Sequence, residues 1–533
     1  MTEQSDAVDK IKTGYTFTTP SIDLGVLMVD GEPQTDVRIR LSLSMLNRHG
    51  LVAGATGTGK TRTLQLLAEQ ISAAGVSVFA ADIKGDLSGI AIPGEPSEKL
   101  LARTQKIGQD WKPAGCPTEF YALGGQGTGV PLRATVSSFG PILLSKVLGL
   151  NETQESSLGL VFHYADTQGL PLLDLADLRE LLVYLTGDEG KAELKAIGGL
   201  SAATVGVILR SLVTLQTQGA DEFFGEPEFD TRDLIRTTAD GKGVISLLEL
   251  PNLQDRPAIF STFLMWVLAD LFHDLPEIGD VDVPKLVFFF DEAHLLFDGA
   301  SKAFLDAIGQ TVRLIRSKGV GIFFVTQSPT DVPDNVLAQL GSRVQHQLRA
   351  HTPNDAKALK ATVQTYPTSQ YDLAATLQGL GIGEAIVTVL NPDGAPTPVA
   401  WTRMLAPQAS MGPMPAEWMT NGVASSAMQA KYGQEINRDS AYEMLTRRLE
   451  AGAAKAQAEA DAAARAKGQA EYDKQQAAQE RSQAREQAAP RRTSSRPAPR
   501  SGVERVLGSA TFWNQVIRVG GQVARTMWGT ARR

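Results

Sequence analysis

The 533-residue chain contains a single cysteine, Cys116, and this scarcity excludes several classes of protein. One cysteine cannot close a disulfide within the chain or build a cysteine-based zinc site, which is typical of a protein in a reducing compartment such as the cytoplasm. The six histidines are scattered and include no H-E-x-x-H motif. The sequence therefore predicts no transition-metal site built by protein side chains alone.

Long apolar runs are also absent. Apolar runs such as residues 286–290 have the length of a strand and fall far short of the ~20 residues that a membrane-spanning helix needs. The N-terminus is acidic and polar, unlike a signal peptide. We therefore expect a cytoplasmic protein without a transmembrane segment. The chain is too long for one hydrophobic core, so several domains are expected.

The charge is unevenly distributed along the chain. The net charge is −8 at pH 7, yet residues 487–533 hold nine arginines and one acid, so residues 1–486 carry −16. A basic tail on an acidic protein is typical of a segment that binds another molecule. Its target could be nucleic acid, an anionic lipid surface or the acidic body itself.

The apolar pattern is that of an α/β protein. Strict alternation over 36–46 predicts a half-buried strand. A helix over 61–74 is flanked by short apolar strands at 51–54 and 76–81, which is the beginning of a mostly parallel sheet. Further strands are expected at 244–250, 286–290, 319–326, 342–348 and 384–390, the last of which pairs with 398–404.

The order of these segments predicts a discontinuous core. Four helices are expected within 91–240, so we interpret this range as a mostly helical insertion; a separate domain between two unrelated sheets is the alternative. The predicted parts are a short N-terminal β region (1–48), the core (49–90 and 241–405), the insertion (91–240), a connector (406–440), an Ala-rich charged helical arm (441–490), and a basic linker with an amphipathic C-terminal helix (491–533).

The sequence G-A-T-G-T-G-K-T at 54–61 is a P-loop motif placed between a predicted strand and a predicted helix. Its glycines let backbone N–H groups surround phosphates, and the helix N-terminus adds positive partial charge. We expect Lys60 to reach the β- and γ-phosphates and Thr61 to bind Mg²⁺. The motif thus predicts ATP and Mg²⁺ as cofactors, bound by Gly54, Ala55, Thr56, Gly57, Thr58, Gly59, Lys60, Thr61 and Arg62.

A P-loop hydrolase also needs an acid at the end of a neighbouring strand, and F-F-F-D-E at 288–292 supplies it. Asp291 would position Mg²⁺, and Glu292 would polarise the attacking water as a general base. Gln327 ends the next strand, where it could contact the γ-phosphate or that water. An acid-rich helix start and a strand-end cap are the structural alternatives for these positions.

Three arginines are candidates for a role at a subunit boundary. Arg313 and Arg316 lie on the predicted helix 301–318, and Arg343 lies at the start of the strand at 342–348. An arginine that enters the neighbouring subunit's site would neutralise charge in the transition state. A solvated or structural role is the alternative for each of them.

Six motifs in this order resemble the HerA–FtsK branch of P-loop ATPases, in particular the bacterial HerA-like family of the YjgR type. They are N-R-H-G-L-V-A-G-A-T-G-T-G-K-T, D-I-K-G-D-L, F-F-F-D-E-A-H, R-L-I-R-S-K-G-V-G, V-T-Q-S-P and L-G-S-R. The resemblance implies a RecA-like ATPase core in a homo-oligomeric ring of six subunits, with ATP between subunits and translocation along double-stranded DNA. It also implies that Asp82 and Asp86 lie near the nucleotide or the subunit boundary.

Two features depart from that family. HerA itself carries a large N-terminal β-barrel that binds a nuclease, whereas about 48 residues precede the P-loop here, which weakens the case for a nuclease partner. The acidic body also shows no DNA-attracting surface in its composition. A ring ATPase or nucleotide-dependent scaffold that acts on a protein partner is therefore the alternative.

Overall fold

The computed structural model describes residues 2–487, except 197, 251–256, 280, 299 and 301. The chain divides into two compact units, Met1–Ala451 and Gly452–Arg533. The predicted basic linker and C-terminal helix at 491–533 lie outside the described residues. Within the described part of the chain, no helix combines the length and apolar character needed to cross a membrane.

Twelve strands among the described residues form one sheet in the order β2-β1-β12-β11-β10-β3-β9-β8-β4-β7-β5-β6. The eight strands from β10 to β6 are parallel, and the remaining four pair antiparallel. The predicted α/β class with a mostly parallel sheet is confirmed. The strands are β1 (Ser21–Val29), β2 (Glu32–Ser42), β3 (Gly50–Ala53), β4 (Ser77–Asp82), β5 (Thr118–Leu123), β6 (Val130–Leu132), β7 (Ile245–Glu249), β8 (Leu286–Phe290), β9 (Val320–Thr326), β10 (Ser342–Gln345), β11 (Glu384–Thr388) and β12 (Ala400–Met404).

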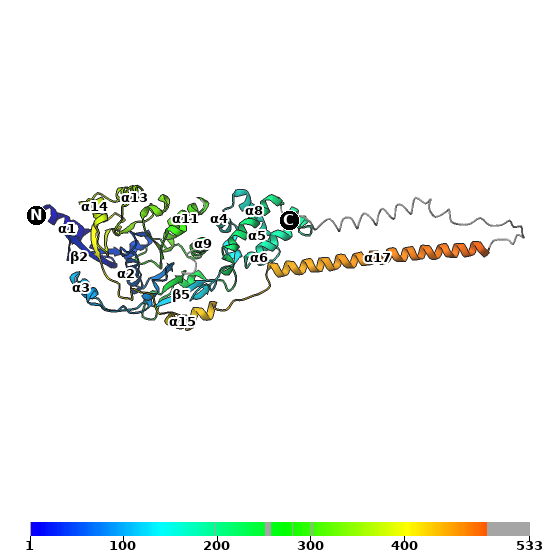
Figure 1. Cartoon of the computed structure of the whole chain (residues 1–533), viewed down its shortest axis with the longest axis horizontal. Helices are drawn as coiled ribbons and strands as arrows, with labels where there is room; N and C mark the ends of the chain where they lie inside the picture. Colours follow the sequence, from blue (N-terminus) through cyan, green and yellow to red (C-terminus); the bar gives the residue numbers. More distant parts are fainter. Residues whose placement is uncertain are drawn as a thin grey trace. The chain divides into compact units, whose positions relative to one another are not determined.

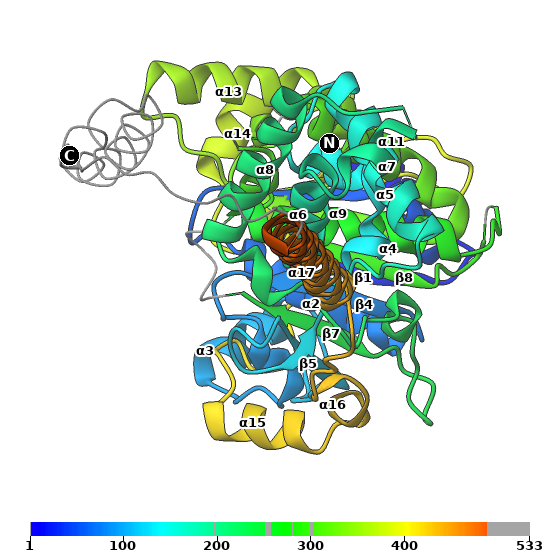
Figure 2. The same cartoon turned by 90° about the vertical axis from the view of Figure 1, so that its right-hand side faces the viewer.

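The helices cover both faces and edges of this sheet. In both views α3 and α15 lie on the opposite side of the first unit from α13 and α14 (Figures 1 and 2). The helices are α1 (Thr2–Gly14), α2 (Lys60–Ala73), α3 (Glu98–Lys106), α4 (Val136–Val147), α5 (Glu152–Thr167), α6 (Leu175–Thr186), α7 (Lys191–Ala196), α8 (Ala202–Thr217), α9 (Pro257–Asp274), α10 (His294–Phe297), α11 (Lys302–Ile315), α12 (Asp334–Leu337), α13 (Pro353–Gln364), α14 (Leu373–Gly379), α15 (Ala416–Ala424), α16 (Ala427–Tyr432) and α17 (Ala441–Gln487).

The central strands form because their sequences are almost wholly apolar. Every residue of β8 and β9 is buried, which is typical of parallel strands covered on both faces. Successive side chains alternate between two cores: Phe288 packs on the side of α9 and α11, and Phe289 on the side of α2. The P-loop therefore stands on a rigid, fully buried platform.

The helical region lies where the sequence predicted it, with α4, α5, α6 and α8 at the opposite end of the unit from α1, α13 and α14 (Figure 1). Capping boxes at Asn151 and Asp174 begin α5 and α6. Phe139 stacks on Trp266 of α9 with ring centroids 6.2 Å apart, so one apolar core continues from the sheet into these helices. The domain boundaries stay a prediction.

Three segments differ from the expected secondary structure. The strand predicted over 36–46 ends at Ser42, because Leu43 and Leu46 bury their side chains at the three-residue spacing of a 3-10 turn. The range 91–240, interpreted as mostly helical, also contributes β5 and β6 to the sheet. The N-terminus begins with α1, whose end is fixed by the buried Tyr15: its hydroxyl donates to the Val387 carbonyl at 3.0 Å.

The predicted helical arm is confirmed as α17, drawn as one continuous helix in Figure 1. Its beginning belongs to the first unit, where Leu445 is fully buried and the amide of Tyr442 donates to Asp177 at 2.8 Å. From residue 452 to 485 every described side chain is exposed. The Ala-rich composition thus gives helix without a core-facing stripe.

Candidate active site

The predicted site residues other than the three arginines gather at one edge of the sheet because the carboxyl ends of parallel strands meet there. The order β3-β9-β8-β4-β7 places the P-loop first, then Gln327, the Asp291–Glu292 pair and Asp82. The P-loop is fixed to its neighbours through two backbone bonds, from Gly54 N–H to the Thr326 carbonyl (3.2 Å) and from Ala55 N–H to the Gln347 carbonyl (2.8 Å). Gln327 is exposed beside this anchor point.

The P-loop has a shape that only glycine permits at its first position. Gly54 has φ +157°, and a Cβ there would lie 2.5 Å from the Cβ of His346. Lys60, the first residue of α2, donates from Nζ to the carbonyls of Gly54 (2.7 Å) and Ala55 (3.3 Å), so its ammonium lies over the loop. Burial lowers the pKa of Lys60, an effect that the charges of Glu292 and Asp291 oppose. Thr56 and Gly57 form the exposed tip.

The acidic pair is buried at the end of β8. The Oδ1 atom of Asp291 accepts the N–H of Glu292 at 2.9 Å, and Oδ2 is buried with no hydrogen-bond partner among the described residues. Burial, helped by the charge of Glu292, raises the pKa of Asp291 to about 7. Glu292 has φ +47°, a strained conformation for a residue with a side chain, which is a common feature of functional sites.

These residues fit a magnesium ion. The unpartnered Oδ2 of Asp291 and the hydroxyl of Thr61 are hard oxygen donors of the kind that Mg²⁺ prefers. No group of three or more His, Cys, Asp or Glu residues among those the structure describes could hold a metal by itself. This agrees with the usual way proteins bind Mg²⁺, with one or two side chains, water and substrate phosphates.

A lysine that sequence analysis did not name holds the proposed general base. Lys84 lies in the loop after β4, and its Nζ pairs with Oε1 of Glu292. Asp82 shapes this loop, because its carboxylate accepts the N–H groups of Gly85 (2.7 Å) and Leu87 (2.7 Å). Burial alone would raise the pKa of Glu292, but the bond to Lys84 and its charge lower it overall.

The family follows from comparison with known sequences. The model of the helicase HerA-like C-terminal family matches residues 27–533. The chain belongs to this family. The probable helicase MJECL08 of Methanocaldococcus jannaschii is 25% identical over 391 residues, which are 70% of this chain and 68% of that protein. The DNA double-strand break repair helicase HerA of Sulfurisphaera tokodaii is 23% identical over 360 residues, which are 66% of this chain and 64% of that protein, so the chain spans just under two thirds of HerA.

Solved structures show the same fold. The bacterial conjugative coupling protein TrwB, in an unbound form, matches this HerA-like chain with a TM-score of 0.50 at 16% sequence identity. The match covers 76% of this chain and 95% of the TrwB chain. TrwB in complex with the ATP analogue ADPNP also has a TM-score of 0.50, at 17% identity, with 76% and 94% covered. These structures confirm the predicted RecA-like fold, and the family match with its helicase relatives confirms the predicted HerA–FtsK superfamily. The HerA-like chain is a P-loop ATPase.

The three predicted arginines lie at the other edge of the sheet. The carbonyl of Val312, next to Arg313, contacts the ring of His49 just before β3 at 2.7 Å. Because β3 has four residues, roughly 13 Å separate this edge from the P-loop. Arg313 is exposed, Arg316 is half-buried, and Arg343 is half-buried with its guanidinium bonded to Thr365. The structure therefore does not bring these arginines to the P-loop of their own chain.

Two more residues of the HerA-like site were missed from the sequence. Glu249 ends β7 directly opposite Asp82 of β4, and burial, with the charge of Asp82, raises its pKa to about 8. Arg349 donates to the carbonyl of Thr56 in the P-loop at 3.3 Å. Neither Glu249 nor Arg349 lies in a recognisable sequence motif. Of the residues that were missed, only Lys84 lies in one, because it stands between the two acids of D-I-K-G-D-L.

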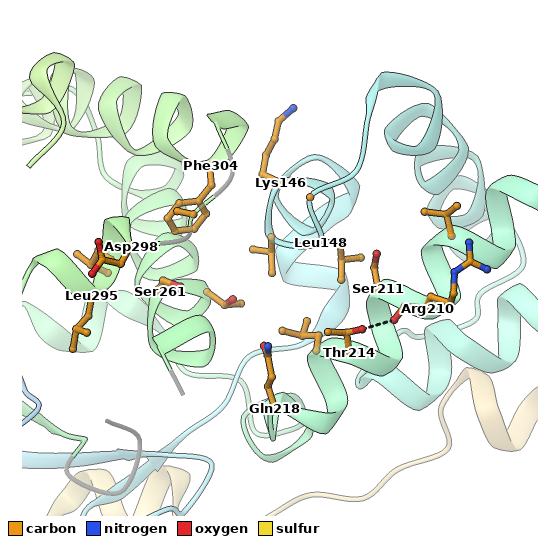
Figure 3. A pocket seen from close by; sticks show the side chains of 17 residues that line it. Lys146, Leu148, Arg210, Ser211, Thr214, Gln218, Ser261, Leu295, Asp298 and Phe304 are labelled. Atoms are coloured by element: carbon orange, nitrogen blue, oxygen red, sulfur yellow. Dashed lines mark hydrogen bonds between the residues drawn. The ribbon is translucent and has the colours of Figure 1, made fainter. Parts of the chain in front are cut away.

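A cavity lies apart from the sheet edge that carries the P-loop. It has a volume of about 490 Å³ between α8 and the end of α4 on one side and α9, α10 and the start of α11 on the other (Figure 3). Lys146 and Arg210 line it opposite Asp298. None of the predicted site residues lines it. It is therefore separate from the candidate active site.

We predict that Lys84→Met lowers the ATP turnover number several-fold and moves the acid limb of the pH profile to higher pH. Lys84 favours the charged form of Glu292, so removal of the ammonium raises the pKa of that carboxyl, and less of it is ready to accept a proton at a given pH. Steady-state phosphate release between pH 5.5 and 9 measures both effects. Lys84→Arg keeps the charge and should keep the wild-type limb. If the acid limbs of the pH profiles of Lys84→Met and wild type coincide, the prediction is wrong.

Proposed function

We propose that this HerA-like ATPase hydrolyses ATP with Mg²⁺ as a ring motor coupled to movement along double-stranded DNA, in the cytoplasm. The observation that carries the hydrolytic part is the meeting of three charged groups at one sheet edge: the Lys60 ammonium over the P-loop, the buried Asp291, and Glu292 held by Lys84. This is the arrangement that phosphoryl transfer to water requires.

Each residue has a distinct part in the proposed reaction. The P-loop amides from Gly54 to Thr61 bind the phosphates, and Lys60 lies against the β- and γ-phosphates. Thr61 and Asp291 would hold Mg²⁺, which neutralises phosphate charge when it is bound. Glu292 accepts a proton from the attacking water.

Other predicted residues support these groups. Gln327, exposed beside the P-loop, orients the water or the γ-phosphate. Asp82 positions the loop after β4 and does not contact the nucleotide. Its carboxylate is fully buried and already accepts three backbone N–H groups of that loop. Asp86 has a buried Oδ1 without a hydrogen-bond partner among the described residues, so it is the acid of this loop that is available to the nucleotide or its metal shell.

The DNA part of the proposal rests on the family. The Sulfurisphaera relative is named a DNA double-strand break repair helicase. A ring would give a role to Arg313, Arg316 and Arg343, which lie at the sheet edge away from their own P-loop and would serve a neighbour's P-loop in a head-to-tail assembly. The acidic composition keeps a protein partner as the alternative substrate.

Measuring ATP hydrolysis with and without DNA tests this function. We expect phosphate release that requires Mg²⁺, rises several-fold with double-stranded DNA, and loses this stimulation as salt increases, because phosphate contacts weaken with salt. Lys60→Ala should abolish hydrolysis, whereas Lys360→Ala, at an exposed site on α13, should not. Hydrolysis that DNA leaves unchanged would favour the protein-directed alternative. No hydrolysis at all would overturn the proposal.

A further inference from the structure

His49 lies between the 3-10 helix Leu43–Arg48 and β3, in a backbone conformation that residues with a side chain rarely adopt. Its φ is +60° and its ψ is 169°, a region that is populated almost only by glycine. Such a conformation persists only where the surrounding contacts hold it, and it is concentrated at functional sites. His49 is at the opposite end of β3 from the P-loop, so its role must follow from what its ring contacts.

The ring of His49 makes two hydrogen bonds in the interior. Nδ1 accepts the N–H of Ile322 in β9 at 3.0 Å, so Nδ1 carries no hydrogen. A neutral imidazole then has its single hydrogen on Nε2, which donates to the carbonyl of Val312 in α11 at 2.7 Å. Burial lowers the pKa of His49 to about 4, so near pH 7 the ring keeps one donor and one acceptor.

The bond to Val312 holds the end of the helix that carries Arg313. Val312 belongs to the last turn of α11, where carbonyl groups accept hydrogen bonds from outside the helix. Arg313 is the next residue, so the ring fixes the backbone from which this guanidinium extends. Ile322 lies beyond the turn between α11 and β9, so the ring also ties together the two sides of the turn that contains Arg316.

The main chain at His49 holds the segment of the third candidate arginine. The carbonyl of His49 accepts the N–H of Ser342 at 3.1 Å, and Ser342 directly precedes Arg343. The carbonyl of Arg48 accepts the N–H of Gly341 at 2.9 Å. His49 therefore contacts α11, β9 and the start of β10 at once.

Close packing leaves these contacts little freedom. A Cβ on Gly321 would lie 2.4 Å from the carbonyl oxygen of Leu46, and a Cβ on Gly50 would lie 2.3 Å from the ring of Phe323. The backbone on both sides of His49 therefore lies directly against β9. Because β3 is buried along its whole length and ends at the P-loop, the ring relates the end of α11 to a rigid strand.

We propose that His49 is the positioning residue for the α11 arginine that enters the neighbouring subunit's site, because its Nε2–H holds the end of α11 against β3 and β9. This inference rests on the proposed ring and names a residue that serves the site of the next subunit. His49 lies at the far end of β3 from the P-loop, so it does not contact the nucleotide of its own chain. A displacement of about 1 Å at a group that acts in the reaction costs about 100-fold in rate, which is the effect expected when the bond to Val312 is lost.

Two substitutions at this position separate the two bonds of the ring. In His49→Asn the amide oxygen replaces Nδ1 and accepts the N–H of Ile322, but Val312 loses its donor. Asparagine adopts a positive φ more readily than most residues, so backbone strain does not account for a loss. In His49→Gln the amide nitrogen replaces Nε2 and donates to Val312 again. We expect ATP turnover to fall about 100-fold in His49→Asn and to stay near wild type in His49→Gln, with ATP binding unchanged in both.

Mixed rings of full-length chains show which site has lost its activity. Turnover of His49→Asn should return on mixing with Lys60→Ala, whose subunits keep a well-placed α11 arginine. It should not return on mixing with Arg313→Ala, or with Arg316→Ala if that is the inactive variant, because neither protein then supplies a placed arginine. The reverse pattern would show that His49 supports the P-loop of its own chain, and the inference would be wrong.

The outcomes separate this inference from the proposed function. If an inactive α11 arginine variant regains activity with Lys60→Ala while His49→Asn keeps wild-type turnover by itself, the ring is right and His49 positions nothing. If His49→Gln loses as much turnover as His49→Asn, the bond to Val312 is not the cause and the inference is overturned. If neither Arg313→Ala nor Arg316→Ala loses turnover, the site takes no arginine from α11, and both the proposed shared site and this inference fail.

Discussion

Replacement of Glu292 by glutamine should lower the turnover number for ATP by about 100-fold or more while the protein still binds ATP. Glutamine has the size and shape of glutamate, so the chain can keep the φ of +47° and the packing at this nearly buried position. Its amide oxygen is too weak a base to take a proton from water. Lys60 and Asp291, which would hold the phosphates and Mg²⁺, remain in place.

Two measurements on the same preparation check this result: steady-state phosphate release and equilibrium binding of ATP. Glu119→Gln is the matched control, because Glu119 is also a largely buried glutamate paired with a cation, Arg236 at 3.2 Å. It lies near the start of β5, away from the strand ends that carry the site, so turnover should be unchanged. A Glu292→Gln protein that keeps more than about a tenth of its turnover would show that another group accepts the proton.

The central strands and the P-loop could be predicted from the sequence because local signals agree there. The run L-V-F-F-F is too short for a core helix and is followed at once by two acids, and β8 has the predicted bounds 286–290. The edge strand β6 could not be predicted, because it has three residues and includes Pro131, which is disfavoured inside a sheet. The sheet accepts it at its edge, where a missing N–H costs little.

The site was predictable only as far as strand order allows. Residues after neighbouring parallel strands meet at one edge whatever the details, which brings the P-loop, Asp291 and Gln327 together. The pairing of Lys84 with Glu292 depends on the register of β4 against β8 and on a turn shaped by Asp82. The wall of the P-loop beside β11 depends on the bond from the N–H of Gly383 to the carbonyl of Thr58, which are more than 300 residues apart. Such contacts leave no local pattern.

The arginines show a different limit. Sequence spacing named Arg313, Arg316 and Arg343 without distinguishing among them. The structure ties Arg343 to its own chain, through Thr365 and through the ring of Tyr366, 5.9 Å away, and leaves Arg313 exposed on α11. We therefore propose Arg313 as the arginine that completes the neighbouring subunit's site.

Arg313→Ala should reduce turnover by on the order of 10³-fold, although Arg313 is at the sheet edge away from its own P-loop. The loss arises because the transition-state charge in the next subunit is no longer neutralised. Lys60→Ala should also be inactive, since it removes the ammonium over the P-loop. Nucleotide binding should survive in Arg313→Ala and be lost in Lys60→Ala, which distinguishes the two defects.

A mixture of these two inactive proteins should regain activity if subunits share sites. An Arg313→Ala subunit keeps its P-loop and a Lys60→Ala subunit keeps its arginine, so about a quarter of the interfaces in a randomly mixed ring combine both intact parts. Arg316→Ala mixed with Lys60→Ala is the control for position, since Arg316 is one helical turn further along the chain. Suppose that mixed rings form and that Arg316→Ala is inactive by itself. If only its mixture with Lys60→Ala then regains activity, Arg316 is the shared arginine. If neither arginine variant loses activity, the site is complete within one chain.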